Sequence, residues 1–205
     1  MVSGHTGGTI DKLESIKGYQ VERSKKEFIE QVKAHWYFTA LVSQNTSLRL
    51  ISCFYALRDV TATVDSIPLI ASSVMSKKIA AGADKILLDV TVGQGAFMKN
   101  MSDAEKLSET MVALGREVNR ETIAVITDMS QPLGKAIGNR LEITEALEIM
   151  QGKGREDITD FICELAEILL TLAQVDVSQE DIRHHLVGGQ ALAKFEELIQ
   201  AQGEI

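Results

Sequence analysis

The stretch KILLDVTVGQGAF, residues 85–97, decides the fold of this chain. It begins with a nearly continuous run of large apolar residues, which is typical of a parallel strand buried on both faces. SDAEKLSETMVALGREVN (102–119) follows with the spacing of an amphipathic helix, capped by a box of Ser102 and Glu105, and ETIAVITD (121–128) is a second apolar strand. Strand, helix and strand joined by short loops form a βαβ unit. The sequence therefore predicts an α/β fold, with a mainly parallel sheet and flanking helices.

Helices are predicted on both sides of this unit. SKKEFIEQVKA opens with a capping box in which Ser24 and Glu27 each satisfy an amide of the other. DSIPLIASSVMSKKIAAG is a second helix, with Ser66 as its N-cap and Gly82 as the residue whose left-handed conformation ends it. From Thr144 to the end, the apolar spacing is helical throughout.

Composition limits the classes of partner. The 205 residues are 45% hydrophobic and 24% charged, with a net charge of −8. An acidic surface disfavours broad binding to nucleic acids or anionic membranes, so neither is expected as a partner. No apolar run reaches the roughly 18 residues of a membrane-spanning helix, and no secretory signal is recognisable. Two distant cysteines, Cys53 and Cys163, are expected to be reduced and packed, in a cytoplasmic protein.

A glycine-rich segment near the N-terminus is the first candidate for chemistry. SGHTGGTIDKLES combines small residues and one imidazole, and leads into a helix that is expected to begin near Thr9. Amides freed by Gly7 and Gly8, together with the Thr6 and Thr9 hydroxyls, can cradle an anion. A plain glycine turn is the alternative.

A cationic helix face is the second candidate. Ser73 and Lys77 are four residues apart and therefore share a face, and Arg58 precedes their helix. One hydroxyl and two cations suit a planar ligand that is rich in carbonyl oxygens. The alternative is a solvated lysine beside a packed serine.

Two loops complete the candidates. The turn with Gly93 and Gly95 follows a strand, at the carboxyl edge where α/β folds place ligands. In TDMSQPLGKAIGNRLEITE, a loop followed by a helix that carries Glu145 can offer carbonyl oxygens and one carboxylate to a cation. A loop without any ligand is the alternative for the second segment.

The motifs that contain these candidates resemble a known family. GHTGGTIDKLESI, YALRDVTATVDSIPLIASSVMSKKIAAGADKILLDV, VGQGAFMK and AVITDMSQPLGKAIGNRLEI occur in the order and spacing of the pyrimidine nucleoside phosphorylases, which include the thymidine phosphorylases. These pentosyltransferases cleave thymidine, uridine or deoxyuridine with inorganic phosphate, and release the base and a pentose 1-phosphate. The resemblance implies a nucleoside and phosphate as substrates, no organic cofactor, a potassium ion and a homodimer.

The resemblance also implies roles for individual residues. The pyrimidine would be held by Arg58, Ser73 and Lys77, and His5 would be catalytic beside the leaving base. Phosphate would lie beside Ser3 and Thr9. Potassium would be bound by the carbonyl oxygens of Leu133 and Ala136 and the carboxylate of Glu145.

The same resemblance suggests a division into domains that close over the substrates. Residues 1–52 and 84–205 are assigned to an α/β domain, and residues 53–83 to a small all-α domain that contributes one or two helices. The family's Lys-His-Ser-Thr-Gly-Gly type phosphate loop has no counterpart here, so little or no turnover is expected. The alternative is a non-catalytic relative that binds a pyrimidine or pairs with another subunit.

One segment departs from the family pattern. Residues 33–54 are aromatic and apolar, and the chain has no Asp or Glu between Gln31 and Arg58. The family pattern then resumes in register at Tyr55. Two compensating frameshifts would leave such a segment, and a genuine but divergent sequence is the alternative.

Overall fold

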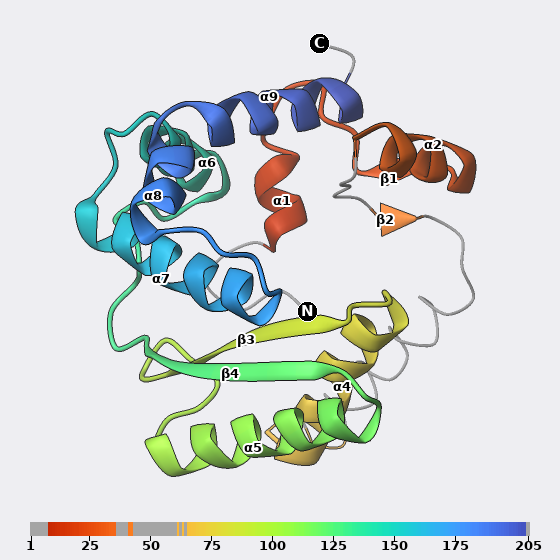
Figure 1. Ribbon diagram of the computed structural model, residues 1–205, viewed down its shortest axis with the longest axis vertical. Helices are drawn as coiled ribbons and strands as arrows, with labels where there is room; N and C mark the ends of the chain where they lie inside the picture. The colour runs from red at the N-terminus through yellow and green to blue at the C-terminus, as the bar shows by residue number, and fades with distance from the viewer. Residues whose placement is uncertain (1–7, 36–40, 43–60, 62, 64, 204–205) are drawn as a thin grey trace. The chain divides into compact units, whose positions relative to one another are not determined.

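The computed structural model describes residues 8–35, 41, 42, 61, 63 and 65–203 (Figure 1). The chain forms two compact units, each of which is described by itself. The first unit takes its described residues from Met1–Tyr55, Gly134–Cys163 and Gln179–Ile205, and the second takes them from Ala56–Leu133 and Glu164–Ser178.

The described elements, in chain order, are α1 (Thr9–Leu13), β1 (Glu22–Arg23), α2 (Lys25–His35), β2 (Leu41–Val42), α4 (Ile67–Ala80), β3 (Lys85–Val92), α5 (Met101–Glu117), β4 (Glu121–Asp128), α6 (Asn139–Met150), α7 (Glu156–Leu172), α8 (Gln179–Val187) and α9 (Gln190–Gln202). This mixture of helices and parallel strands confirms the predicted α/β class.

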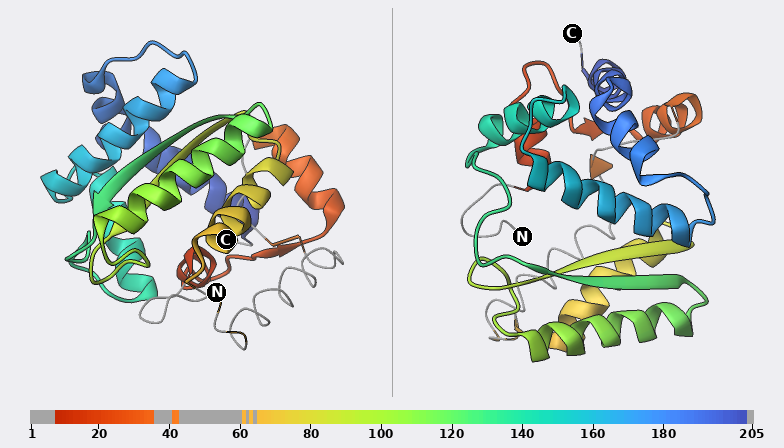
Figure 2. Two further views of the ribbon diagram at one scale, coloured as in Figure 1. Left: turned by 90° about the horizontal axis from the view of Figure 1, so that it is seen from below. Right: turned by 60° about the vertical axis from the view of Figure 1, so that its left-hand side comes forward.

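The second unit is built on the predicted βαβ unit. Strands β3 and β4 pair in parallel, in a register that runs from Lys85 opposite Glu121 to Val92 opposite Asp128. Helices α4 and α5 lie along the same face of this pair (Figure 2). Their apolar side chains and those of β3 form one core, whose buried members are Ala71, Met75, Ile86, Leu88, Val90, Met98, Ala104, Leu107 and Met111.

The burial of β3 differs from the prediction of a strand buried on both faces. Ile86, Leu88 and Val90 are buried, whereas Leu87 is half-buried and Asp89 is exposed. Alternate residues point to opposite faces of a strand, and α4 and α5 cover only the face that holds the buried set. Among the described residues, one face of this apolar run is therefore buried by α4 and α5, while the residues of the opposite face are partly or fully exposed.

Helix α4 shares its core with α5 and β3. The small all-α domain over residues 53–83, with its boundaries at 52/53 and 83/84, stays a prediction. Gly82 follows the end of α4 with φ 81°, as predicted. Ser66 is the N-cap residue, but its side chain makes no capping hydrogen bond. Pro68 occupies the second helical position and has no N–H to offer, which removes one of the two amides that a cap can reach.

The start of α5 corrects another prediction. The N-cap is Asn100, whose Oδ1 accepts from the amide of Asp103 at 2.9 Å, instead of the predicted box of Ser102 and Glu105. Asn100 also donates from Nδ2 to the Asp103 carboxylate at 2.9 Å. The predicted box of Ser24 and Glu27 on α2 is confirmed, with both hydrogen bonds present.

The cap geometry predicts a stability difference. Asn100→Ala should lower the free energy of unfolding by about 1 kcal/mol, because the Asp103 amide loses its acceptor. Ser102→Ala is the matched control and should cost much less. Urea unfolding followed by circular dichroism measures both variants, and an equal loss for the two would contradict the Asn100 cap.

The first unit joins distant parts of the sequence. Its core includes Leu13 and Tyr19 near the N-terminus and Ile199 on α9. The Tyr19 hydroxyl donates to Gln202 Oε1 at 3.0 Å, and both side chains are buried. The short strands β1 and β2 pair in parallel. Helix α6 begins at Asn139, earlier than the predicted start at Thr144, because Gly138 ends the preceding loop there with φ 131°.

Cys163 is the described cysteine, and only 2% of its surface is exposed. Burial raises the pKa of its thiol, and Asp160 adds to this effect, while the nearby Arg183 charge opposes it. The thiolate is the reactive form, so iodoacetamide should modify Cys163 slowly in the folded chain and quickly in urea. Mass spectrometry of the peptide that holds Cys163 measures this without interference from Cys53. Equal rates in both states would show that the thiol is accessible.

Within the described residues, no helix combines the length and apolar character needed to cross a bilayer.

Candidate functional site

The helical period places the predicted ligand residues of α4 on one face. Ser66, Ile70, Ser73 and Lys77 recur at helical spacing and so lie on one face, next to the face that buries Ala71 and Met75. Ser73 is half-buried and Lys77 is exposed. The prediction that Ser73 and Lys77 share a helix face is therefore confirmed, while their ligand stays a prediction.

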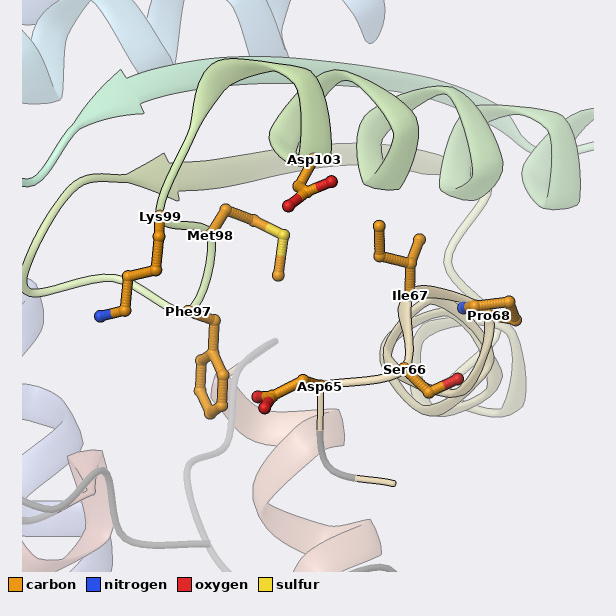
Figure 3. Close-up of a pocket in the computed structure, with 8 residues that line it drawn as sticks. All are labelled: Asp65, Ser66, Ile67, Pro68, Phe97, Met98, Lys99 and Asp103. Carbon is orange, nitrogen blue, oxygen red and sulfur yellow. The ribbon is translucent and has the colours of Figure 1, made fainter. Parts of the chain in front are cut away.

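A cavity of about 580 Å³ lies where this face begins (Figure 3). It lies between the first turn of α4 and the segment that follows β3, and is lined by Asp65, Ser66, Ile67, Pro68, Phe97, Met98, Lys99 and Asp103. The Ile67 and Met98 side chains extend toward each other across it, and Lys99 points away. Lys99 instead donates to the Gln94 carbonyl at 2.8 Å. The cavity is therefore lined by apolar side chains, among them Ile67 and Met98, and by the Asp65 carboxylate and the Ser66 hydroxyl at the start of α4.

Phe97 lines this cavity and is not among the site residues predicted from the sequence. Phe97 is 52% exposed, although its neighbours Ala96 and Met98 are buried. Such a ring offers a flat surface to a planar ligand. The available signal was an aromatic residue directly after a glycine-rich turn at the end of a strand.

The turns that follow β3 and β4 are tied together at the carboxyl edge of the sheet. The Gly95 amide donates to the Met129 carbonyl at 3.1 Å, and the Met129 amide donates to the Val92 carbonyl at 2.6 Å. Gly93 has φ 135°, and a Cβ there would lie 2.6 Å from backbone atoms of Met129 and Ser130. Only glycine permits this approach, so the turn that precedes Phe97 depends on Gly93.

The second polar constellation lies in the first unit, at the loop before α6. The Glu145 carboxylate accepts from the amide of Lys135 at 2.9 Å and from that of Ala136 at 3.4 Å. One turn earlier, Glu142 accepts from the Gly138 amide at 3.2 Å and forms an ion pair with Lys12 of α1. Two carboxylates of one helix therefore hold three amides of one loop.

This loop fits a cation site in its chemistry. A carbonyl oxygen from Ala136 and the Glu145 carboxylate are hard oxygen donors, the kind that bind non-transition cations. A Cβ at Gly134 would collide with the Glu145 carboxylate, so the loop lies tightly against that group. Among the described residues, no group of three or more His, Cys, Asp or Glu side chains could hold a metal ion. A site here would depend on backbone carbonyls.

The pKa of Glu142 reflects these contacts. Burial raises it, but the hydrogen bonds from Lys12 and Gly138 and the Lys12 charge outweigh burial, so the pKa lies below its ordinary value of 4.5. A group with a lowered pKa stabilises the fold above its unfolded value, and this contribution disappears as the pH falls through the folded value.

The consequence is a pH-dependent stability. Glu142→Gln should flatten the fall in the free energy of unfolding below about pH 5, because the variant has no carboxylate to protonate. Urea titrations at several pH values measure this slope, with Glu148→Gln on the same helix as the control. If the free energy of unfolding of Glu142→Gln falls with pH as steeply as that of the unsubstituted chain, the Glu142 carboxylate does not cause this pH dependence.

The remaining predicted residues are placed as follows. Ser3, His5 and Arg58, and most of the divergent segment 33–54, lie outside the described residues. Thr9 is exposed as the first residue of α1. The preceding amide, of Gly8, donates to the Asp11 carboxylate at 2.6 Å. Leu133 is exposed and belongs to the second unit, whereas Ala136 and Glu145 belong to the first.

Comparison with known proteins identifies relatives. Residues 2–192 match the family described as "Glycosyl transferase family, a/b domain". The chain is 52% identical to a pyrimidine-nucleoside phosphorylase of Staphylococcus haemolyticus, 52% to one of Geobacillus stearothermophilus and 50% to one of Bacillus subtilis. Each alignment covers 98% of this chain and 47% of the relative, so the chain spans about half the length of these curated proteins. The chain therefore belongs to the glycosyl transferase family through its α/β domain, and it resembles pyrimidine-nucleoside phosphorylases over nearly all of its length.

Proposed function

We propose that this chain provides the pyrimidine-binding helix and part of the phosphate side of a pyrimidine nucleoside phosphorylase. The reaction would be phosphorolysis of thymidine, uridine or deoxyuridine to the free base and a pentose 1-phosphate. The observation that carries this proposal is the identity of about half of all residues to pyrimidine-nucleoside phosphorylases across 98% of the chain.

The chemistry of α4 supports the proposal. A pyrimidine is planar, with carbonyl oxygens that accept hydrogen bonds, and Ser73 and Lys77 offer a hydroxyl and an ammonium on one helix face. Arg58 would add a second cation. The exposed ring of Phe97 at the start of that face would pack against the flat surface of a base.

These groups would act by stabilising charge. As a phosphate oxygen bonds to C1′ of the pentose, the bond from C1′ to the ring nitrogen breaks and leaves its electron pair on the base. Negative charge then spreads onto the carbonyl oxygens. The Lys77 ammonium and the Arg58 guanidinium, placed beside these oxygens, would bind the transition state more tightly than the substrate. His5 would lie beside the leaving base, and Ser3 and Thr9 beside the phosphate.

A potassium ion is proposed at the loop before α6, with the Leu133 and Ala136 carbonyls and the Glu145 carboxylate as ligands. It would supply a fixed positive charge that steadies the phosphate side. The oxygen-only character of these donors and the close fit of Gly134 against Glu145 support this site. A homodimer and a cytoplasmic location are proposed from the family resemblance alone.

The decisive experiment separates turnover from binding. Release of uracil from uridine by the purified chain is followed chromatographically with and without phosphate, and binding of uridine is measured by calorimetry. Binding with little turnover is expected, and any turnover should require phosphate. Base release that proceeds equally without phosphate would contradict a phosphorylase, and failure to bind uridine or thymidine would contradict the pyrimidine site.

A further inference from the structure

The loop between Gly134 and Gly138 is held by contacts that the proposed reaction does not explain. Glu145 and Glu142 lie three residues apart on α6 and accept from amides at opposite ends of this loop. The Gly138 backbone has φ 131°, a conformation that residues other than glycine rarely adopt. The loop therefore has a defined shape that depends on both carboxylates.

Glu142 has a second partner outside the loop. Its Oε2 forms an ion pair with Nζ of Lys12, and the two side chains are only 19% and 27% exposed. An ion pair shielded in this way is screened less by water and salt than one on the surface. Leu13 of α1 and Ile143 of α6 pack in the same apolar cluster. The ion pair therefore fixes two helices that already touch.

We infer that Lys12 and Glu142 are positioning residues, which set the loop of residues 134–138 in the shape that binds the cation. This inference rests on the proposed potassium site, and adds that its affinity depends on an ion pair whose members are not ligands. Lys12 orients the Glu142 carboxylate, and Glu142 holds the Gly138 amide, so that the Ala136 carbonyl needs little rearrangement when the ion binds. Preorganisation of this kind raises affinity because less ordering is left to the binding step.

The test uses cation-dependent stability, which does not require turnover. A cation that binds only the folded state raises the melting temperature by an amount set by its concentration and affinity. The chain is melted in potassium chloride and in tetramethylammonium chloride of equal ionic strength, across a concentration series. The difference between the two salts gives an apparent potassium affinity for each variant.

Four variants separate positioning from general stability. Lys12→Met and Glu142→Gln should each weaken the potassium affinity about tenfold or more, which corresponds to roughly 1.4 kcal/mol. Lys12→Arg retains the charge and should restore most of the affinity. Lys194→Met removes a pair with Glu197 within α9, and should leave the affinity unchanged. A merely structural role would lower the melting temperature equally in both salts.

The possible failures are distinguishable. A native chain that melts identically in both salts would show that the proposed cation site is wrong, and this inference with it. If potassium raises the melting temperature of the unsubstituted chain, Lys12→Met and Glu142→Gln to the same extent, the inference about Lys12 and Glu142 is wrong, while the proposed cation site stands. Phosphorolysis is measured separately and decides neither result.

Discussion

Under the proposed function, Lys77→Met is expected to reduce phosphorolysis by roughly 100- to 1000-fold, the range found when one preorganised donor to a developing negative charge is removed. Methionine keeps much of the length and apolar stem of lysine, but it has no charge and no N–H donor. Lys77 is exposed near the end of α4, so the substitution should leave the fold intact. The loss should therefore appear in kcat and in kcat/KM together, because the interaction strengthens in the transition state.

The adjacent residue is a matched control. Lys78 is half-buried and follows Lys77 by one helical step, so its side chain points about 100° away around the helix. Lys78→Met should change turnover little. Because the chain is expected to turn over slowly, long incubations with uridine and phosphate at high chain concentration compare the residual turnover of the two variants with that of the unsubstituted chain. Uridine affinity from calorimetry gives a second readout. Equal losses in both variants would contradict a specific role for Lys77.

Gly93→Ala is expected to destabilise the second unit by about 3 kcal/mol or more, which places it among the severe single substitutions. Two costs combine. The backbone has φ 135°, which an L-residue with a Cβ avoids, and the new Cβ would lie 2.6 Å from the Met129 carbonyl carbon and the Ser130 amide nitrogen. Both atoms belong to backbone and cannot rotate away, so the turns after β3 and β4 would have to separate.

Gly82→Ala is the control for the backbone conformation alone. It has φ 81°, but among the described residues no atom other than those of its chain neighbours lies within 4 Å of the Cβ position. Its cost should be near 1 kcal/mol, the penalty of the left-handed conformation without a collision. Urea unfolding of both variants gives the comparison. A Gly93→Ala variant as stable as Gly82→Ala would show that the two turns are not in close contact.

Elements whose apolar residues recur at a regular period were predictable from the sequence. The β3–α5–β4 unit was predicted because its apolar residues switch from a continuous run to helical spacing and back. Ser73 and Lys77 were placed on one face for the same reason, since four residues span about one helical turn. Local signals were less reliable. The N-cap of α5 is Asn100 and not the predicted Ser102. Both residue types can cap a helix, and the geometry of the preceding turn decides which of the two lies at the N-cap position.

The sequence by itself determined the α/β class, the parallel βαβ unit and the helix that carries Ser73 and Lys77, because periodicity is a local property of the chain. Only the tertiary structure decided that one face of β3 is covered by α4 and α5, that Phe97 borders a cavity, and that Glu142 pairs with Lys12. These features join residues that are distant along the chain. Such contacts are selected by packing and charge across the whole fold, and no short stretch of sequence encodes them.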